Sequence, residues 1–313
     1  MTDQDRTRRA GLLLGLGAYL TWGVLPIYFK AVDHVSALEI VCHRIVWSLV
    51  FLAILATVLR RWPGIRAAVA TPRVLMTLVL TSLLIGANWL IWIYAVVSGH
   101  VLEGSLGYYL NPLVNVLFGV FLLKEKLSRP QIGAVFLAAA GVAILAAGAS
   151  GAIWISLSLA FSFATYGFLR KVAPVDSIEG LTVETALLTP AALSWILIHH
   201  HRGTRGFLAG DGATDLLLVA GGTITAIPLL LFTAAARRLP YSMLGFLQYI
   251  APSLQFLLAV LAFGERFTLA HAICFGAIWT ALAIFVFEGV RLSRVSRRSP
   301  PAPATAPLRS RPR

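Results

Sequence analysis

The chain has 313 residues, of which 58% are hydrophobic and only 12% are charged. A soluble domain carries about 25% charged residues, so this composition excludes an ordinary soluble protein. The net charge of +13 would favour nucleic-acid binding in a soluble chain, but here it indicates basic loops on one side of a membrane.

Ten apolar segments of helical length follow one another with short connections. They cover residues 10–30, 38–59, 74–97, 103–123, 130–149, 152–170, 178–198, 213–236, 243–263 and 268–289. Because a helix needs about 20 apolar residues to cross a bilayer, we expect an all-α membrane protein with ten transmembrane helices. Residues 1–9 should form a cytoplasmic N-terminus. Residues 290–313, rich in Arg, Ser, Pro and Ala, should form a disordered, basic cytoplasmic tail.

The cations are unevenly distributed among the connections. Most of the 26 Lys and Arg residues fall in the N-terminus, in alternate loops and in the C-terminal tail. The positive-inside rule then predicts that both termini are cytoplasmic, which agrees with an even number of spans. We also expect the first apolar segment to remain as a helix and not to be removed as a signal peptide.

The first three helices contain four of the eight tryptophans. Trp22 and Pro26 lie in the first helix, where proline frees a backbone carbonyl and permits a kink. Asn88, Trp89 and Trp92 lie in the third helix. Tryptophans often form interfacial belts, but Trp89 and Trp92 lie well inside the segment. We therefore favour an aromatic cavity wall for these residues.

Charges inside the helices are rare. Arg44 in the second helix and Glu184 in the seventh are the unambiguous ones, and each needs a partner or a water-filled cavity because an intramembrane charge costs ~2.5–3.5 kcal/mol or more. A direct salt bridge is one interpretation, but the expected depths separate the two groups by ~12 Å along the membrane normal. The other interpretation is that both line a cavity, where Arg44 attracts an anion and Glu184 binds a proton or a cation. His43, beside Arg44, is either a titrating group or a packing histidine.

The fourth and ninth helices repeat each other with a shift of 140 residues. The shift pairs Pro112 with Pro252. It also pairs Tyr108 with Gln248, Tyr109 with Tyr249, Asn115 with Gln255, Glu125 with Glu265, Lys126 with Arg266, Arg44 with Glu184, and Asn88 with Pro228 in the eighth helix. The halves 10–149 and 150–289 each contain five helices, so the second copy enters the membrane from the opposite side. This predicts two inverted five-helix repeats, which are common in secondary transporters that bind substrate near the midplane.

Polar side chains line one face of the fourth helix. Tyr108, Asn111 and Asn115 follow the spacing i, i+3 and i+7, and the repeat supplies Gln248 and Gln255 on the ninth helix. Such groups either hold helices together or line a cavity. Because they flank a proline in both copies, we favour the cavity.

Several functions are disfavoured by the residues that the chain lacks. It has no nucleophile elbow, phosphate-binding glycine loop or HExxH pattern, so we expect neither an enzyme nor a bound cofactor. Cys42 and Cys274 lie inside predicted helices, and three adjacent histidines at 199–201 cannot converge on one ion, so no metal site is expected. Gly133, Gly141 and Gly148 make the fifth helix a packing or dimer surface, and the protein is expected to be a monomer or a homodimer.

The motifs themselves resemble a known family. GLGAYLTWGVLPIYFK, EIVCHRIVWS, NWLIWIYAV, EGSLGYYLNPLVNVLFG and LGFLQYIAPSLQFLLAV are similar to RarD-type bacterial members of the EamA family, in the drug/metabolite transporter superfamily. The resemblance implies an inner-membrane protein with a central cavity, and relatives that move amino acids, nucleotide sugars and other metabolites. The RarD type is associated with chloramphenicol sensitivity, which does not identify a physiological substrate.

The expected function is secondary transport of small metabolites, namely amino acids or similar compounds and amphiphilic drugs, by alternating access. The fourth and ninth helices would rock at Pro112 and Pro252, and Glu184 would couple transport to protons. The expected partners are a small-molecule substrate and the lipid bilayer, with no nucleic acid. A non-transporting membrane scaffold or sensor is the alternative, and a membrane-embedded enzyme is a weaker third interpretation.

Overall fold

The computed structural model describes residues 3–147, 152–201, 207–208, 211–262 and 269–298, and this part of the chain contains helices but no strands. The helices are α1 (Asp3–Ala31), α2 (Ala37–Val58), α3 (Trp62–Ala70), α4 (Pro72–Val97), α5 (Val101–Phe121), α6 (Arg129–Ala146), α7 (Ile153–Val172), α8 (Ser177–His201), α9 (Gly212–Ala236), α10 (Tyr241–Gln248), α11 (Ile250–Leu261) and α12 (Leu269–Arg298). Eight of these described helices are long and apolar enough to cross a membrane. Neither α5 nor the pair α10 and α11 is among the eight.

Each predicted apolar segment coincides with helix, with four differences. The first helix begins at Asp3, within the predicted N-terminus 1–9. The short helix α3 was not predicted. The predicted ninth helix is divided at Tyr249 into α10 and α11, a break that Pro252 permits because it has no N–H to donate to the carbonyl of Gln248. The last helix continues to Arg298, beyond the predicted end at 289, because good helix formers follow and the first proline is Pro300.

Polar side chains fix where some helices begin. Ser36 accepts a hydrogen bond from the backbone N–H of Glu39 at the start of α2. Asp211 accepts one from the hydroxyl of Thr214 and one from the backbone N–H of Ala213 at the start of α9. These hydrogen bonds, led by that from Thr214, hold the pKa of Asp211 below its usual value. Both residues satisfy backbone donors that a helix N-terminus leaves free.

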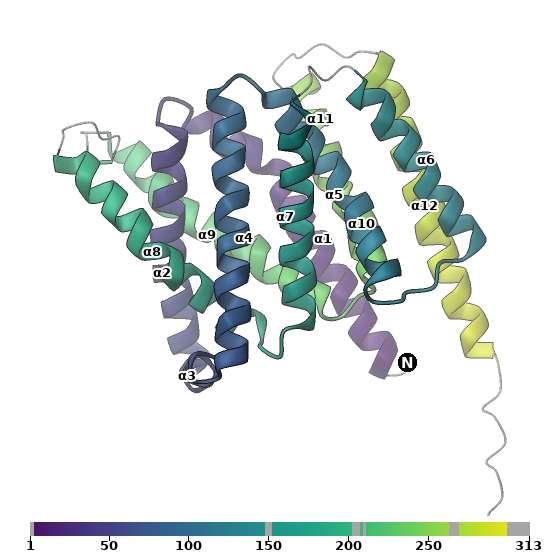
Figure 1. Ribbon diagram of the computed structural model, residues 1–313, viewed down its shortest axis with the longest axis horizontal. Helices are drawn as coiled ribbons and strands as arrows, with labels where there is room; N and C mark the ends of the chain where they lie inside the picture. Colours follow the sequence, from purple (N-terminus) through teal and green to yellow (C-terminus); the bar gives the residue numbers. More distant parts are fainter. Residues whose placement is uncertain (1–2, 148–151, 202–206, 209–210, 263–268, 299–313) are drawn as a thin grey trace, which may run out of the picture.

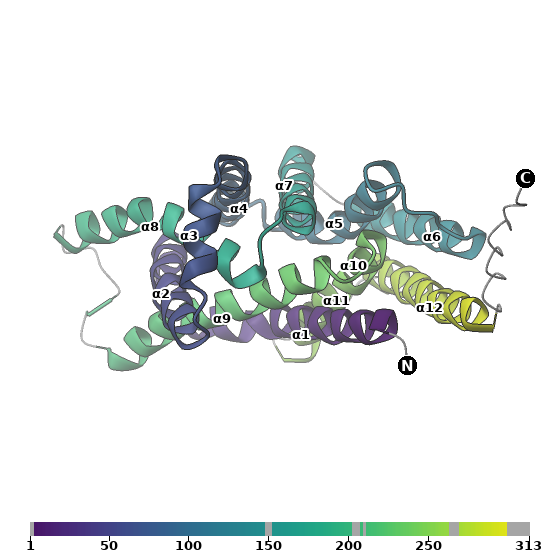
Figure 2. The same cartoon turned by 90° about the horizontal axis from the view of Figure 1, so that it is seen from below.

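The helices form two layers. Figure 2 shows α4, α5, α6, α7 and α8 in the first layer, and α1, α2, α9, α10, α11 and α12 in the second layer. Each layer therefore contains helices from both predicted halves of the chain. Figure 1 shows that α1 begins and α12 ends at the same end of the bundle, which we call the near end; the opposite end is the far end.

Apolar side chains cover the outside as well as the inside. Phe136, Leu261 and Phe287 are more than 70% exposed, whereas Tyr19, Tyr166 and Phe232 are fully buried in the largest core cluster. An apolar outer surface of this extent is typical of a protein that faces lipid.

The contact between α2 and α9 is close because of one glycine. A Cβ at Gly222 would collide with the backbone of Trp47 and Ser48. The hydroxyl of Ser48 donates to the carbonyl oxygen of Gly222 at 2.8 Å. This approach carries Arg44, one turn earlier on α2, to the side of Thr225 on α9.

Some sequence features lie outside the described residues. These are Glu265 and Arg266, which the repeat pairs with Glu125 and Lys126, together with Gly148 and the tail from residue 299 onward. The ten spans and the inverted relation of the halves remain predictions at this point.

Candidate substrate cavity

A cavity of about 510 Å³ is lined by residues from both layers. Ten of the residues singled out in the sequence line it: Trp22, Pro26, Arg44, Asn88, Trp89, Trp92, Tyr108, Gln248, Pro252 and Gln255. Its surface is mainly aromatic and aliphatic, with a few polar groups among them. This size and lining are typical of binding sites for small molecules.

Arg44 is the charged side chain in the interior of this cavity. Its Nε donates to the hydroxyl of Thr225 at 2.6 Å. Its guanidinium carbon lies 5.4 Å from the ring centre of Phe29 and 5.7 Å from that of Trp89. Within the described part of the chain, no carboxylate forms a salt bridge with Arg44. Thr225 and two aromatic rings therefore hold this cation in place of an acidic partner.

Amides in the cavity wall also hold the helices together. Asn88 donates from its side chain to the carbonyl oxygen of Leu159 and to the hydroxyl of Ser162, at 3.0 and 2.9 Å. Gln255 donates to the carbonyl oxygen of Trp22 at 3.0 Å. These residues therefore have one polar atom engaged between helices while the side chain borders the cavity.

Asn111 and Asn115 do not line the cavity, although they share a helical face with Tyr108. Asn111 donates to the carbonyl oxygen of Ala160 at 3.0 Å. Asn115 donates to Asn111 at 3.1 Å and to Gln248 at 2.8 Å, which joins the two layers. The amide groups of both asparagines therefore donate to neighbouring helices outside the cavity, because α7 and α10 pack against this part of α5.

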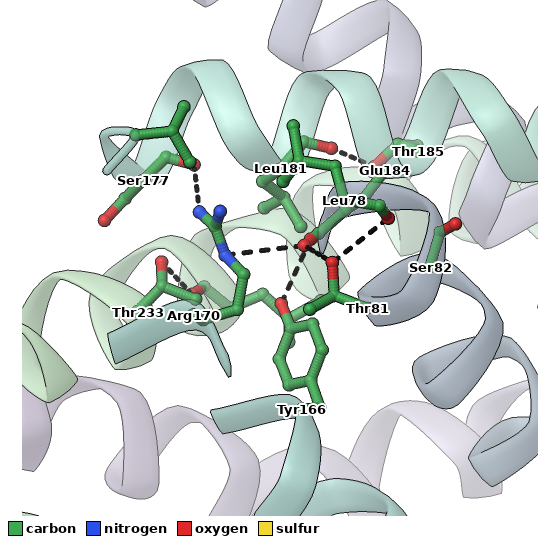
Figure 3. A network of polar contacts seen from close by, with 12 residues as sticks. Leu78, Thr81, Ser82, Tyr166, Arg170, Ser177, Leu181, Glu184, Thr185 and Thr233 are labelled. Atoms are coloured by element: carbon green, nitrogen blue, oxygen red, sulfur yellow. Dashed lines mark hydrogen bonds and ion pairs between the residues drawn. The ribbon is translucent and has the colours of Figure 1, made fainter. Parts of the chain in front are cut away.

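Glu184 also lies outside the cavity, in a buried polar network (Figure 3). Its carboxylate accepts from the hydroxyls of Thr81 and Tyr166 at 2.5 and 3.3 Å. Its ion-pair partner is Arg170, whose Nε lies 3.4 Å from the carboxylate, and the two side chains are 1% and 0% exposed. Arg170 also donates to the carbonyl oxygens of Asp176 and Ser177. Arg170 is the last residue of the predicted segment 152–170, and its side chain is buried against α8.

A smaller pocket lies beside this network and shares part of its lining with the cavity. Glu184 and Tyr166 line the smaller pocket, and so do Thr225, Trp89 and Leu229, which also line the cavity. Thr225, whose hydroxyl accepts from Arg44, therefore also borders the pocket that Glu184 lines.

The remaining candidates lie elsewhere. His43 is 3% exposed and packs on Phe207, with ring centres 4.6 Å apart. Neither of its ring nitrogens has a hydrogen-bond partner among the described residues. Pro112 and Pro228 lie inside continuous helices and do not line the cavity.

The cavity reaches the far end of the bundle. Lys30 and Asp33 belong to its lining and form an ion pair at 3.1 Å, with side chains 67% and 56% exposed. Because α1 begins at the near end, Lys30 in its last turn and Asp33 just after it lie at the far end, and the pair marks a rim that is open to solvent.

Aromatic side chains close the other end of the cavity. Trp22 and Phe163 line it, with ring centres 5.8 Å apart, and both contact Phe232, at 5.7 and 5.2 Å. Tyr19 and Tyr166 pack on Phe232 from the side of the near end. This aromatic cluster forms a floor between the cavity and the near end.

Beyond the floor, hydrogen bonds join the two layers. The carboxylate of Glu125 accepts from the backbone N–H groups of Tyr241 and Ser242, at 2.5 and 2.9 Å, and from the hydroxyl of Ser242 at 2.6 Å. Lys171 donates to the carbonyl oxygens of Ala236 and Leu239, at 2.7 and 2.5 Å. The first contact places a carboxylate at the N-terminus of α10, and the second places an ammonium at the end of α9. Both arrangements match the helix dipole.

Comparison with known proteins gives the family. A model of the EamA-like transporter family matches residues 9–147. An uncharacterized transporter of Vibrio cholerae is 46% identical over 96% of this chain and 99% of its own length. Protein RarD of Escherichia coli is 42% identical over 93% of this chain and 98% of its own length. The chain belongs to the RarD type of the EamA family.

The fold agrees with a solved structure. A protein crystal structure that is 23% identical in sequence superposes with a TM-score of 0.70, covering 91% of this chain and 99% of that one. Together with the apolar helices, membership of the EamA family makes this chain a multi-pass bacterial membrane protein of the drug/metabolite transporter type.

Some cavity residues of this EamA protein were not singled out in the sequence. Thr225, Leu229, Phe29 and Phe163 all line the cavity. The shift of 140 residues pairs Ile85 with Thr225 and Trp89 with Leu229, and all four of these line it. Because Trp89 was singled out, the repeat would have found Leu229 had it been applied to Trp89 as it was to Asn88. Neither Ile85 nor Thr225 carried such a signal.

Proposed function

We propose that the chain is a secondary transporter that carries small metabolites across the bacterial inner membrane by alternating access. The main observation behind this proposal is the cavity. It has an exposed rim at the far end, marked by Lys30 and Asp33, and an aromatic floor toward the near end, where Trp22 contacts Phe232. A site that is open at one end and closed at the other is what one state of an alternating-access cycle requires.

The packing of the helices supports two inverted repeats of five helices each. α1 packs against α9 and α11, while α7 packs against α4 and α5. The predicted repeat makes α1 equivalent to α7, α9 to α4, and the pair α10 and α11 to α5, so these are equivalent neighbours. Figure 2 agrees, because each layer holds the counterparts of the other. In this proposal, α5 and the pair α10 and α11 are the fourth and ninth of ten spans.

The charge distribution supports an orientation. The near end carries the N-terminus and the basic connections before α3 and before α10, so the positive-inside rule assigns it to the cytoplasm. The cavity then opens to the periplasmic side. The state described is outward-open, and both termini are cytoplasmic.

Closure on the cytoplasmic side depends on a small group of hydrogen bonds and one ion pair that join the two layers. Glu125 holds the start of α10, and Lys171 holds the end of α9. Arg237 adds an ion pair to Asp176 at 2.9 Å. These bonds join one layer to the other, so releasing them would allow the layers to separate at the cytoplasmic side while they close at the rim.

Glu184 is proposed as the site of proton coupling. Its carboxylate is buried against Arg170, Thr81 and Tyr166. The small pocket beside it adjoins the cavity. Protonation would remove its attraction for Arg170 and so alter the packing of α7, which carries Phe163 of the floor.

Release from sealed proteoliposomes tests transport directly. Vesicles that contain the purified full chain are loaded with a labelled metabolite pool, and release is followed with and without an inward pH gradient. We expect selective release that Arg44→Ala abolishes and that the exposed control Arg66→Ala, on α3, retains. Failure of the wild type to release any metabolite or lipophilic drug would contradict transport and favour the scaffold or sensor.

A further inference from the structure

We propose that the cavity selects organic monoanions, namely carboxylates with an apolar body and no ammonium group. This inference rests on the proposed function, because it names the cargo of the same cavity. Among the described residues that line the cavity, the charged ones are Arg44, Lys30 and Asp33. Lys30 and Asp33 neutralise each other at the exposed rim. The interior therefore carries one unbalanced positive charge.

The carboxylate that could have balanced this charge is committed elsewhere. Glu184 occupies the position in the second repeat that Arg44 occupies in the first, but it is bound to Arg170, Thr81 and Tyr166 behind the cavity wall. The carboxylate of a zwitterionic amino acid could pair with Arg44, but its ammonium group would have no carboxylate partner in the interior of the cavity. An organic cation would be repelled by Arg44 and would have no carboxylate partner there. Burying an unpaired charge is costly, so both classes should bind more weakly than an anion.

The guanidinium of Arg44 is arranged to receive a carboxylate. Thr225 takes the Nε hydrogen, and the rings of Phe29 and Trp89 flank the guanidinium carbon. Among the described residues, neither terminal nitrogen of Arg44 donates a hydrogen bond. Two free terminal nitrogens form the fork that binds a carboxylate in a bidentate manner. A phosphate monoester carries a charge of about −1.5 to −2 at pH 7, which one guanidinium does not balance.

The rest of the cavity fits an apolar body. Trp22, Trp92, Tyr108 and Phe163 present aromatic surface, and Leu229 adds an aliphatic one. A volume of about 510 Å³ accommodates a metabolite and not a macromolecule. Aromatic rings stack well on flat apolar groups, so an aryl or indolyl carboxylate is a suitable probe.

Equilibrium binding tests the selectivity without any flux. The purified full chain in lipid nanodiscs is titrated with 3-phenylpropionate, phenylalanine and 2-phenylethylamine, which share one body and differ in charge. Indole-3-propionate, tryptophan and tryptamine form a second series. Binding is read by isothermal titration calorimetry. We expect the carboxylate of each series to bind at least about 10-fold more tightly than its zwitterion or amine, because a hydrogen-bonded charge contributes ~1.5–3 kcal/mol.

Variants of one residue test whether Arg44 causes the selectivity. Arg44→Gln should weaken binding of the carboxylates by about 10–100-fold and reduce the preference over the zwitterion. Arg44→Lys keeps the charge but loses the fork, so it should be intermediate. Arg66→Gln, an exposed cation on α3, removes the same charge and should change nothing. Gel filtration of each variant confirms that it is folded and monodisperse before titration.

Three results would overturn the inference. They are binding of a zwitterion or amine as tight as that of its carboxylate, unchanged carboxylate binding in Arg44→Gln, and no carboxylate binding in either series. Failure of the proposed function looks different. Arg44-dependent binding of carboxylates without release from proteoliposomes would remove transport and leave the anion selectivity. Release of amino acids or amines alone would support transport and contradict the anion selectivity.

Discussion

Arg44 and Arg170 are both held inside the helical bundle, but by different kinds of neighbour. Arg170 is fully buried and has a carboxylate, Glu184, and two carbonyl oxygens. Arg44 is half-buried and has a hydroxyl, from Thr225, and two aromatic rings. Because an intramembrane charge needs compensation, the first arrangement already has its counter-charge within the protein. The second arrangement leaves both terminal nitrogens of Arg44 without a hydrogen bond to a described residue, so they can bind a ligand.

The pair of Arg170 and Glu184 makes a prediction at the scale of single residues. Glu184→Gln should lower the stability of the purified protein by about 3–5 kcal/mol, because it leaves Arg170 buried without a counter-charge. The variant should also lose the dependence of release on a pH gradient. The double variant Glu184→Leu with Arg170→Met removes both charges, so it should recover most of the stability but not the coupling. Thermal unfolding in detergent and proteoliposome release measure the two effects.

Two results would contradict this prediction. If Glu184→Gln were as stable as the wild type, the ion pair would not be the partner that Arg170 requires. If release by the wild type did not depend on a pH gradient, Glu184 would have no role in coupling.

The sequence located some of these residues and not their partners. Arg44 was recognisable because a charge inside a long apolar segment needs an explanation. Arg170 was not recognisable in this way, because it lies at the end of an apolar segment. There, an error of one or two residues in the helix boundary changes the prediction from buried helix to loop. The alternative of an Arg44–Glu184 salt bridge followed from equal positions in the two repeats. The structure pairs Glu184 with Arg170 because the end of α7 lies beside α8.

At the scale of elements, the close approach of α2 and α9 positions Arg44 beside Thr225. Gly222 allows this approach, since a Cβ there would collide with the backbone of Trp47 and Ser48. The backbone on both sides belongs to helices packed in the bundle, so neither can shift without moving its neighbours.

Gly222→Ala should therefore destabilise the protein by about 1–3 kcal/mol through overpacking and weaken ligand binding by displacing Arg44. Gly276→Ala on α12 is the matched control, because a Cβ there meets nothing within 4 Å. In a helix, this control should be neutral or slightly stabilising. Thermal unfolding of both variants measures the difference, and equal stability of the two would show that the helices are not in contact at Gly222.

The elements themselves were largely predictable, since every apolar segment of about 20 residues became helix. Hydropathy could not predict α3, which is short and lies outside the long apolar segments. It also could not predict the division at Tyr249, because the shift of 140 residues pairs Pro112 with Pro252 and only the latter interrupts its helix. Proline permits a break, and the packing around it decides whether the break occurs.

At the scale of the whole molecule, the two layers enclose the cavity lined by Arg44 and are joined beyond its floor. The sequence predicted the two halves from their repeat, but not the layers, because each layer combines helices from both halves (Figure 2). Glu125 is the clearest link, since it closes the start of α10 from the other layer. Its role could not be read from the sequence, where it appeared only as a repeated acid after an apolar helix.

Thiol labelling from each side of the membrane tests alternating access most directly. Ser105, which lines the cavity, is changed to Cys in a chain whose buried Cys42 and Cys274 are replaced by Ala. A membrane-impermeant thiol reagent is then applied to whole cells and to inside-out vesicles. We predict labelling from both sides. Glu125→Ala should accelerate labelling from the cytoplasmic side by at least about 10-fold, because it removes three hydrogen bonds to a carboxylate. The exposed neighbour Lys126→Ala should not. Labelling from the periplasmic side alone, unchanged by Glu125→Ala, would contradict alternating access and leave a static outward-facing vestibule.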